Sequence, residues 1–348
     1  MNELKLKIKL AFIAGLRDVV SNEISQYSDL RIITEEVDSF YLDFVKDLID
    51  IKKLRSVSRA YVIVQDPKYN PLYISNHKSI LDNLIEIVIS DNKNKFKTFK
   101  ITCSGSDSPE VRSIAEYIEE KHTLTEEEEA DMKIHIIKNN EIWEIGIQIT
   151  PRPLSLRSYK LMNMSGAMDP TIAYAVNSLC KLDKMESYLN VFSGSATLLI
   201  EAGQCYPNLK ELIGFDNNKK NISLAIQNIK KTELIKKIQL KEKDIFNNPY
   251  LGKFDAITSD LPFGMSMSKN EDLENLYQCF IEYCERTLNF NGKMVVYTSK
   301  HEILKRIILK SKFKIVKTLE LKFITSVNSY LCPRIFVCRK SVKIKKNK

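Results

Sequence analysis

The sequence predicts an α/β protein whose second half folds around a mostly parallel, doubly wound sheet. Three observations lead to this prediction. Strand-like and helical segments alternate regularly after residue 170, which is typical of parallel sheets covered by helices. Polar or glycine-containing turns follow several strand-like segments of that half. The first half instead groups its segments into two smaller sets that are typical of α+β units.

The first of these sets ends near residue 66. Residues 4–12 alternate apolar and polar side chains with the period of a strand, whereas residues 16–27 place apolar side chains at helical spacing. By the same criteria we expect strands at 31–37, 39–44 and 58–65 and a helix at 47–54. Residues 1–66 are therefore predicted to form a small α+β unit.

The second set follows a predicted linker. Residues 67–75 hold two prolines and break the periodicity. After them the pattern predicts helices at 80–90 and 109–121 and strands at 98–104, 132–138 and 142–149. We expect this second unit to end at residue 150.

A basic, proline-containing segment connects the two halves, and we expect a linker over residues 151–169. It carries Arg152, Arg157 and Lys160 close to Tyr159. Cations beside an aromatic ring can bind the phosphates and bases of RNA. A hinge whose charges are simply solvated is the alternative that the sequence leaves open.

The second half contains the regular alternation of helices and strands. The predicted helices are 170–182, 197–205, 218–230, 273–288 and 302–310. The predicted strands are 187–192, 211–215, 238–243, 254–259, 292–298, 312–321 and 329–339. We expect these segments to form one domain over residues 170–348.

Composition narrows the class of protein. The formal net charge is +9 and the pI is near 9.0, which favours a polyanionic partner, although a lysine-rich composition alone gives the same charge. The seven cysteines include no Cys-x-x-Cys pair, and the four histidines do not stand at metal-ligand spacing. No apolar run approaches the roughly 18 residues of a membrane span. We therefore expect a cytoplasmic protein in a reducing compartment, with no metal and no membrane partner.

A glycine turn follows the first strand of the second half. Gly194 stands between Ser193 and Ser195, and Thr197 begins the next helical segment. A glycine lets the backbone approach a ligand closely, and a threonine can cap a helix. A tight turn that binds nothing remains the alternative.

Acidic residues end the next two strands. Asp216 is followed by Asn217 and Asn218, and Asp244 follows the third strand. In a Rossmann-like site an acid at the end of the second strand binds ribose hydroxyls, and an acid after the third strand is placed to accept from an adenine amino group. A helix cap at Asp216 and an ordinary loop aspartate at Asp244 are the competing interpretations.

The fourth strand ends in the sequence Ser-Asp-Leu-Pro-Phe-Gly, residues 259–264. Asp260 can accept hydrogen bonds from an exocyclic amine, Pro262 restricts the backbone, and Phe263 offers a face on which a base can stack. The motif indicates chemistry on a nucleobase amino group. Taken alone, it is also compatible with a plain turn at a strand end.

Together, these motifs resemble the class I S-adenosylmethionine-dependent methyltransferases, and more narrowly the THUMP-containing RNA guanine-N2 methyltransferases. The resemblance rests on Phe-Ser-Gly-Ser-Ala-Thr-Leu-Leu-Ile-Glu-Ala, Gly-Phe-Asp-Asn-Asn, Lys-Asp-Ile-Phe and Asp-Leu-Pro-Phe-Gly in this order. It implies a ferredoxin-like unit over residues 1–66, a THUMP-like RNA-binding domain over 67–150, a linker over 151–169 and a Rossmann-like methyltransferase domain over 170–348.

The resemblance also implies an activity, which is methylation of the exocyclic N2 amine of a guanine in tRNA. Asp260, Pro262 and Phe263 would orient and stack the base. The RNA-binding residues would include Arg152, Arg157, Tyr159 and Lys160. The residues expected at S-adenosyl-L-methionine are Phe192, Ser193, Gly194, Ser195, Thr197, Asp216, Asn217, Asp244, Ile245 and Asp260.

Two positions differ from the family pattern. The family usually has an acid where Asn190 stands and a second glycine where Ala196 stands. These two positions leave a catalytically silent RNA-binding protein as one alternative. Methylation of ribosomal RNA or of another nucleobase amine is the other, because Asp-Leu-Pro-Phe fits any exocyclic amine. We expect a monomer that acts on tRNA. The sequence does not decide whether the protein needs a small activating partner subunit.

Overall fold

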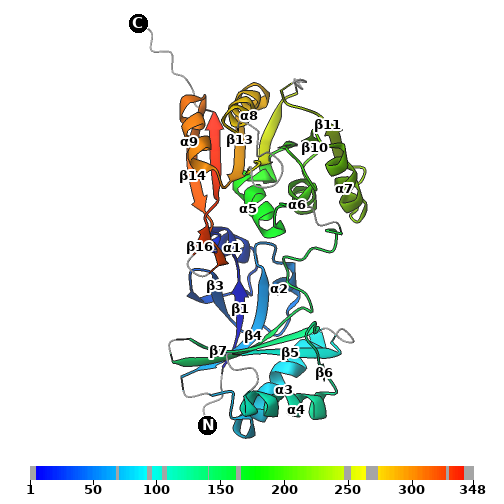
Figure 1. The fold of residues 1–348 in the computed structure, drawn as a ribbon, viewed down its shortest axis with the longest axis vertical. Coiled ribbons are helices and arrows are strands. Elements are labelled where there is room, and N and C mark those ends of the chain that lie inside the picture. The colour runs from blue at the N-terminus through cyan, green and yellow to red at the C-terminus, as the bar shows by residue number, and fades with distance from the viewer. Residues whose placement is uncertain are drawn as a thin grey trace. The chain divides into compact units, whose positions relative to one another are not determined.

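The computed structural model describes residues 5–67, 70–91, 96–103, 108–139, 141–161, 166–246, 252–263, 273–326 and 329–340. The chain divides into two compact units (Figure 1). One consists of Met1–Phe12 and Val20–Leu156, and the other of Ile13–Val19 and Arg157–Lys348. The change of unit after residue 156 falls inside the predicted linker.

The first unit contains an eight-stranded sheet with the strand order β2-β3-β1-β4-β8-β7-β5-β6. Its strands are β1 (Leu6–Ala11), β2 (Ile32–Glu35), β3 (Ser39–Asp43), β4 (Arg59–Asp66), β5 (Thr98–Cys103), β6 (Thr125–Glu126), β7 (Met132–Asn139) and β8 (Ile142–Gln148). Its helices are α2 (Ile49–Lys53), α3 (Ile74–Asp91) and α4 (Pro109–His122), together with the part of α1 (Arg17–Ile24) from Val20 onward. Strand β4 pairs antiparallel with β8, so strands on both sides of residue 66 share one sheet. The division into ferredoxin-like and THUMP-like units stays a prediction.

Two details of this unit differ from the expectation. Helix α3 begins at Ile74, inside the segment 67–75 that was expected to be a linker. Its buried positions Leu81, Leu84 and Val88 anchor the helix, and adding residues to an anchored helix costs little. Strand β6 has two residues, which is too short for a periodic signal.

The second unit contains a seven-stranded sheet with the order β11-β10-β9-β12-β13-β17-β14. Its strands are β9 (Ser187–Val191), β10 (Glu211–Asp216), β11 (Ile238–Glu242), β12 (Phe254–Asp260), β13 (Leu288–Thr298), β14 (Phe313–Glu320) and β17 (Arg334–Lys340). Strands β9 to β13 run parallel, and β17 is antiparallel to β13 and β14. The prediction of a mostly parallel, doubly wound sheet is confirmed.

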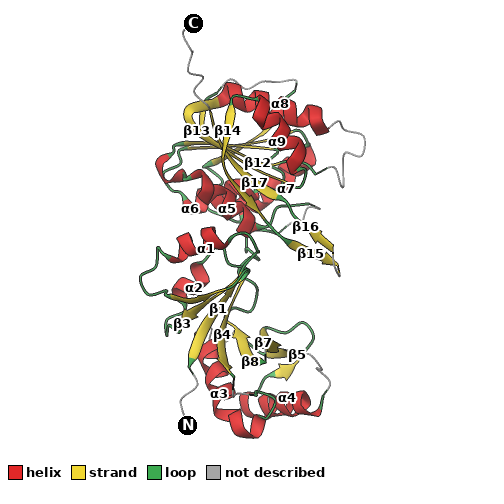
Figure 2. Ribbon diagram, turned by 90° about the vertical axis from the view of Figure 1, so that its left-hand side faces the viewer, coloured by secondary structure: helices red, strands yellow, loops and turns green. Residues whose placement is uncertain are grey.

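Helices cover both faces of this sheet. They are α5 (Pro170–Cys180), η1 (Leu182–Lys184), α6 (Thr197–Cys205), α7 (Lys219–Lys230), α8 (Leu273–Thr287) and α9 (His301–Lys310). Figure 2 shows α8 on one side of the sheet and α5 and α6 on the other, as right-handed crossovers on the two sides of β9 require. Helix α5 begins where the sequence predicts, because Asp169 accepts a hydrogen bond from the Thr171 N–H and Pro170 occupies the first helical position.

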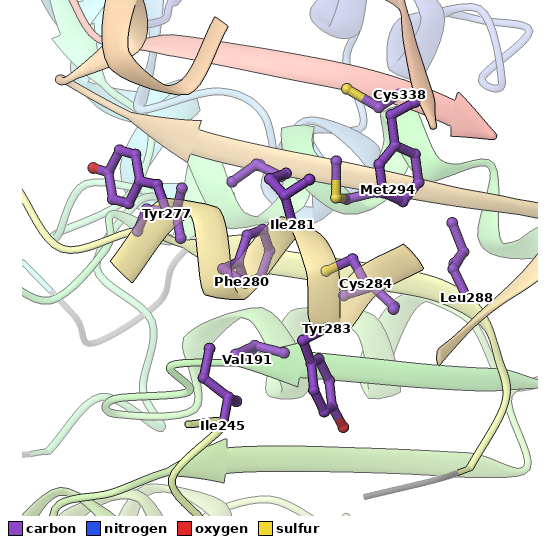
Figure 3. Close-up of a cluster of buried hydrophobic side chains, with 14 of the residues drawn as sticks. Val191, Ile245, Tyr277, Phe280, Ile281, Tyr283, Cys284, Leu288, Met294 and Cys338 are labelled. Atoms are coloured by element: carbon purple, nitrogen blue, oxygen red, sulfur yellow. The ribbon is translucent and has the colours of Figure 1, made fainter. Parts of the chain in front are cut away.

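The apolar side of α8 forms much of the core. Figure 3 shows Ile281 beside Met294 of β13, and Tyr283 on the side of Val191 and Ile245. These residues are all at most 4% exposed. A parallel sheet with helices on both faces requires such nearly continuous apolar strands, and this packing holds the strand ends in place.

The last predicted strand, residues 329–339, is wrong as a single element. It is divided into β16 (Ser329–Leu331) and β17 by Cys332 and Pro333, because proline lacks the N–H that a continuous strand would donate. Strand β16 pairs with β15 (Phe323–Ser326) in a separate hairpin. None of the helices in the described ranges has both the length and the apolar character needed to cross a membrane.

Candidate active site

The carboxyl ends of four adjacent strands bring the predicted site residues to one edge of the sheet. Strands β11, β10, β9 and β12 are neighbours and parallel, so the residues that follow them share that edge. Strand order reverses between β9 and β12, and ligands bind at such a switch point in open α/β sheets. Asp244, Asp216, the glycine turn and Asp260 therefore stand in the order that one extended ligand would contact.

The glycine turn after β9 has an unusual backbone. Phe192, Gly194 and Ala196 have φ values of 57°, 50° and 64°, all in the left-handed region. The Ser193 N–H donates to the Phe215 carbonyl at 2.7 Å, and the Ala196 N–H donates to the Ser193 carbonyl at 2.8 Å. These bonds place the turn against β10 and direct the N-terminus of α6 toward the sheet edge.

The backbone of Ala196, with its φ of 64°, has a conformation that favours glycine. A left-handed conformation costs an L-residue about 1–2 kcal/mol, while glycine adopts it freely at a cost of about 0.5–1 kcal/mol in chain entropy. We expect Ala196→Gly to raise the free energy of unfolding by about 0.5–1 kcal/mol, measured by urea denaturation.

The matched control is Ala202→Gly, at a buried position inside α6, which should lower the free energy of unfolding by about 1 kcal/mol or more. Equal losses in the two variants would contradict the argument from backbone strain.

Asp216 joins two turns. One carboxylate oxygen accepts from the Gly194 N–H at 2.8 Å, and the other accepts from the Asn218 N–H at 3.0 Å and the Asn221 amide at 3.1 Å. Asn218 is the residue that caps α7, through the Lys220 N–H at 2.9 Å. The carboxylate thus fixes the glycine turn, and Asn221 is a contributor that sequence reasoning missed.

Asp244 and Ile245 follow β11. The Asp244 carboxylate accepts from the Phe246 N–H at 2.9 Å, which is the local turn of an ordinary loop aspartate. The Ile245 side chain is 4% exposed and packs in the core beneath α8. Asn217, after β10, is exposed. Contact of these three residues with a cofactor stays a prediction.

Asp260 ends β12 opposite Tyr297 of β13, and the following turn is held from two sides. The Leu261 N–H donates to the Tyr297 carbonyl at 3.0 Å. The Tyr277 hydroxyl, from α8, donates to the Pro262 carbonyl at 2.8 Å. The Phe263 ring lies 5.6 Å from the Tyr297 ring, centroid to centroid. The turn is therefore a held structure, and Gly264 lies outside the described residues.

Tyr277 was not found by sequence reasoning. Its hydroxyl oxygen also lies 2.8 Å from the Thr298 hydroxyl, so Thr298 donates to Tyr277 while Tyr277 donates to Pro262. Burial raises the pKa of Tyr277 to about 12, which keeps the proton needed for this donation. The available signal was a tyrosine in the second turn of the helix that follows the Asp260 motif.

The carboxyl group of Asp260 is electrostatically unusual. Burial raises its pKa to about 8, and the charge of Lys160 opposes this rise. Lys160 is half-buried and donates to the Met168 carbonyl at 2.9 Å. A carboxyl group that titrates near neutral pH in a sheet-edge site is a candidate for proton transfer.

The linker residues have contacts inside the second unit. The Arg157 guanidinium and the Tyr159 hydroxyl both donate to one carboxylate oxygen of Glu201, at 3.1 Å and 2.8 Å. Tyr159 is 3% exposed, so its ring is not presented for stacking on a base. These contacts fasten the linker to α6, whereas Arg152 is exposed. RNA binding by Arg152, Arg157 and Lys160 stays a prediction, whereas the expected stacking of Tyr159 on a base does not agree with its burial.

Two buried polar atoms at the turn have no partner within the described part of the protein, the Asn190 side-chain carbonyl and the Ser193 hydroxyl. Buried polar atoms are normally hydrogen-bonded, so both mark a place for a polar ligand. The cofactor's ammonium group could donate to the Asn190 oxygen, and the chain therefore fits the cofactor at this end. Among the described residues, no group of three or more His, Cys, Asp or Glu side chains is arranged to hold a metal ion.

Comparisons with known proteins agree with this geometry. Residues 157–326 match the UPF0020 family model, described as RMKL-like, methyltransferase domain. The chain is 27% identical over 157 residues to U6 snRNA (guanine-N(2))-methyltransferase THUMPD2 of Mus musculus, covering 45% of this chain and 28% of that protein. It is 27% identical over 163 residues to tRNA (guanine(6)-N2)-methyltransferase of Thermus thermophilus, covering 47% of this chain and 48% of that one. The matches thus span less than half of these relatives.

A solved structure resembles nearly the whole chain. The crystal structure of TrmN from Thermus thermophilus matches with a TM-score of 0.78 and 19% identity, covering 96% of this chain and 99% of that one. The chain therefore has a mixed α/β, class I methyltransferase fold that matches this structure. Residues 157–326 of this chain therefore match the model of a methyltransferase domain of the UPF0020, RMKL-like type.

Proposed function

We propose that this protein methylates the exocyclic N2 amine of a guanine in tRNA with S-adenosyl-L-methionine as the methyl donor. One observation carries the proposal: Asp260, with a pKa near 8, ends the strand adjacent to the strand that carries the glycine turn. The names of the related guanine-N2 methyltransferases support this substrate class.

The chain offers a contact for each part of the cofactor, whose sulfonium supplies an electrophilic methyl group when bound. Asn190, Ser193 and the glycine turn would hold the methionine end, and Asp244 would accept from the adenine amine. Asp216 would accept from the ribose hydroxyls. Its two oxygens offer about four acceptor positions, and three of these are used within the chain.

Asp260 would accept a hydrogen bond from the guanine amine and orient the nitrogen lone pair toward the methyl group. Transfer would form the nitrogen–carbon bond and break the carbon–sulfur bond of the sulfonium, whose electron pair would stay on the departing thioether. The methylated nitrogen would lose a proton, which the Asp260 carboxylate would accept. Phe263 would stack on the base, which must leave its helix to reach this edge. Tyr277 donates to the Pro262 carbonyl and so fixes the turn that carries Asp260 and Phe263.

The proposal is tested with the purified chain, methyl-labelled S-adenosylmethionine and unfractionated tRNA. We expect N2-methylguanosine as the labelled nucleoside after digestion and mass spectrometry. A labelled adenosine, or label in ribosomal RNA alone, would establish one of the alternative substrates. RNA binding without measurable cofactor binding would instead establish a silent RNA-binding protein.

Lys160 allows a prediction about pH. Its positive charge favours the carboxylate form of Asp260, so Lys160→Met should raise the pKa of Asp260 above its present value near 8. Transfer that depends on this carboxylate increases as pH rises through the pKa. We expect the rising limb of the kcat/KM profile to move to higher pH in Lys160→Met and to return in Lys160→Arg. An unchanged profile in the folded variant would contradict the coupling.

A further inference from the structure

Strand β1 carries lysines on one face and apolar residues on the other. Lys7 and Lys9 alternate with Ile8 and Leu10, which are both 0% exposed. Strand β1 is central, between β3 and β4, and lysine is depleted in strands. Two lysines on one face of a central strand therefore call for a functional explanation.

The same face continues across the sheet. Lys9 stands between Tyr41 and Tyr61 in register, and Lys100 of β5 stands beside Lys133 of β7. We define the lysine face as the side chains that share this side of the sheet or border it: Lys5, Lys7, Lys9, Arg59, Lys100, Lys133, Tyr41, Tyr61 and His135.

A buried carboxylate organises the middle of this face. Glu144, with a side chain 1% exposed, accepts from Lys9 at 2.7 Å and from the Tyr41 hydroxyl at 3.3 Å, and it lies 2.8 Å from His135. Burial alone would raise the pKa of Glu144, but His135 and Lys9 outweigh it and lower the pKa. Glu144 is therefore a carboxylate that holds Lys9 and His135 at defined positions.

Gly146 allows this arrangement. A Cβ at Gly146 would lie 2.3 Å from the Cε1 atom of the His135 ring, so the imidazole occupies the space that a side chain would take. The Tyr61 ring meets His135 edge to face at 4.7 Å. The centre of the lysine face is thus a packed platform of aromatic rings and cations.

The charge of the lysine face is positive. It carries six cations, and the carboxylates paired with them are those of Asp43, Glu128 and Glu144. Arg59 and the end of Lys5 are exposed. Helices α3 and α4 pack against strands β4, β8 and β5 through the apolar residues of this unit, so the helices and the lysine face belong to opposite sides of the sheet.

We propose that the lysine face binds the phosphate backbone of the RNA substrate. The proposal rests on the proposed function only for the choice of RNA. Clustered cations are typical of nucleic-acid surfaces, and the net charge of +9 favours a polyanion. The Tyr41 ring is 2% exposed and lies under Lys9, so it supports this cation and does not stack on a base.

The platform around Glu144 positions Lys9 and the rings, and the exposed Arg59 would contact the phosphates directly. Lys7 and Lys133 are half-buried and make long hydrogen bonds, at 3.4 Å to Gln65 and 3.5 Å to the Glu128 carbonyl, which they would exchange for phosphate oxygens.

The test compares two triple variants of equal net charge. Lys7→Gln/Arg59→Gln/Lys133→Gln alters the lysine face, and Lys53→Gln/Lys78→Gln/Lys121→Gln alters helices α2, α3 and α4 of the same unit. Binding of unfractionated tRNA is measured by filter retention from about 50 to 200 mM salt. We expect the first variant to bind at least about 10-fold more weakly, with the salt slope reduced by about 1 for each lost phosphate contact. The second variant should bind like the unaltered protein.

Equal weakening in both variants, or unchanged binding in the first, would overturn the proposal. Circular dichroism melting checks that each triple variant is folded. If the first triple variant is unfolded, the single variant Lys133→Gln is used in its place, with an expected change of about 1 in the salt slope. Methyl transfer is measured separately, with a higher KM for tRNA and an unchanged kcat expected in the first variant. If the unaltered protein transfers no methyl groups but the first triple variant still loses tRNA binding, the proposed function is refuted. The proposal that the lysine face binds RNA is then still supported.

Discussion

Asp260→Asn is expected to reduce methyl transfer at least about 100-fold, the range of a lost general base, while S-adenosylmethionine binds with nearly unchanged affinity. Asparagine keeps an acceptor oxygen and the shape of the side chain, but it cannot take the proton that the guanine amine loses. Single-turnover transfer to tRNA and calorimetric titration with the cofactor measure the two quantities. Turnover equal to that of the unaltered protein would refute the role of Asp260.

The same substitution has an opposite effect on stability, and its sign follows from the pKa. The pKa of Asp260 is about 8 in the folded protein, whereas the ordinary pKa of an aspartate side chain is 3.8. Between these values the folded state binds the proton that the unfolded state has lost, so this group destabilises the protein progressively as pH rises from about 4 to 8. Asparagine does not titrate. The melting temperature of Asp260→Asn relative to the unaltered protein should therefore increase over this interval.

Asp255, at the other end of β12, is the matched control. Its carboxylate accepts from the Glu186 N–H at 3.0 Å and from the Asn289 amide at 2.8 Å. Burial would raise its pKa, but these hydrogen bonds outweigh it and lower the pKa. Asp255→Asn should therefore lose stability above about pH 4 and keep its turnover per folded molecule. Relative to the unaltered protein, stability should thus increase with pH in Asp260→Asn and decrease with pH in Asp255→Asn. If methyl transfer is lost only in Asp260→Asn, the loss results from the missing carboxylate and not from unfolding.

Asp216→Ala is expected to weaken S-adenosylmethionine binding by at least about 10-fold and to lower the free energy of unfolding by about 2–4 kcal/mol. The carboxylate is 6% exposed and accepts from Gly194, Asn218 and Asn221. Each buried donor left without an acceptor costs about 1–3 kcal/mol, and the glycine turn loses its tie to β10. Calorimetry with the cofactor and urea denaturation measure the two effects.

Asn221→Ala provides the comparison, because it removes one donor and leaves the carboxylate in place. We expect a loss of about 1 kcal/mol in the free energy of unfolding and little change in cofactor affinity. If a folded Asp216→Ala variant bound the cofactor as tightly as Asn221→Ala, the carboxylate would serve the fold alone.

Most of the second unit could be predicted because its signals are local. Helix α6 begins at Thr197 and α7 at Lys219, each within one residue of the expectation. Apolar periodicity lies within each segment, and Asn218 caps α7. Thr197 does not cap α6 as expected, because the N-cap is Ala196, which has no side-chain capping bond. The edge positions of Asp216 and Asp260 follow from the same logic, because parallel strands place their carboxyl ends together. The prediction of a single strand over residues 329–339 failed at Pro333. The apolar pattern continues through this position, but proline has no N–H with which to continue the strand.

Other features required packing between distant segments. Tyr277 reaches Pro262 from 15 residues away, and Gly194 meets Asp216 across 22 residues. Tyr159 was read as a ring for RNA, but the structure places its hydroxyl on Glu201, 42 residues later. No local pattern distinguishes a tyrosine that stacks on a ligand from one that fastens a linker.

The sequence alone therefore determined the order of strands and helices in the second unit and which acids, glycine and aromatic ring end its strands, because periodicity and turn chemistry act over a few residues. The pKa of Asp260, the left-handed backbone at Ala196 and the grouping of cations around Glu144 arise only when separate strands and the linker meet. Burial and electrostatic coupling depend on distance in space, and that distance exists only in the folded chain.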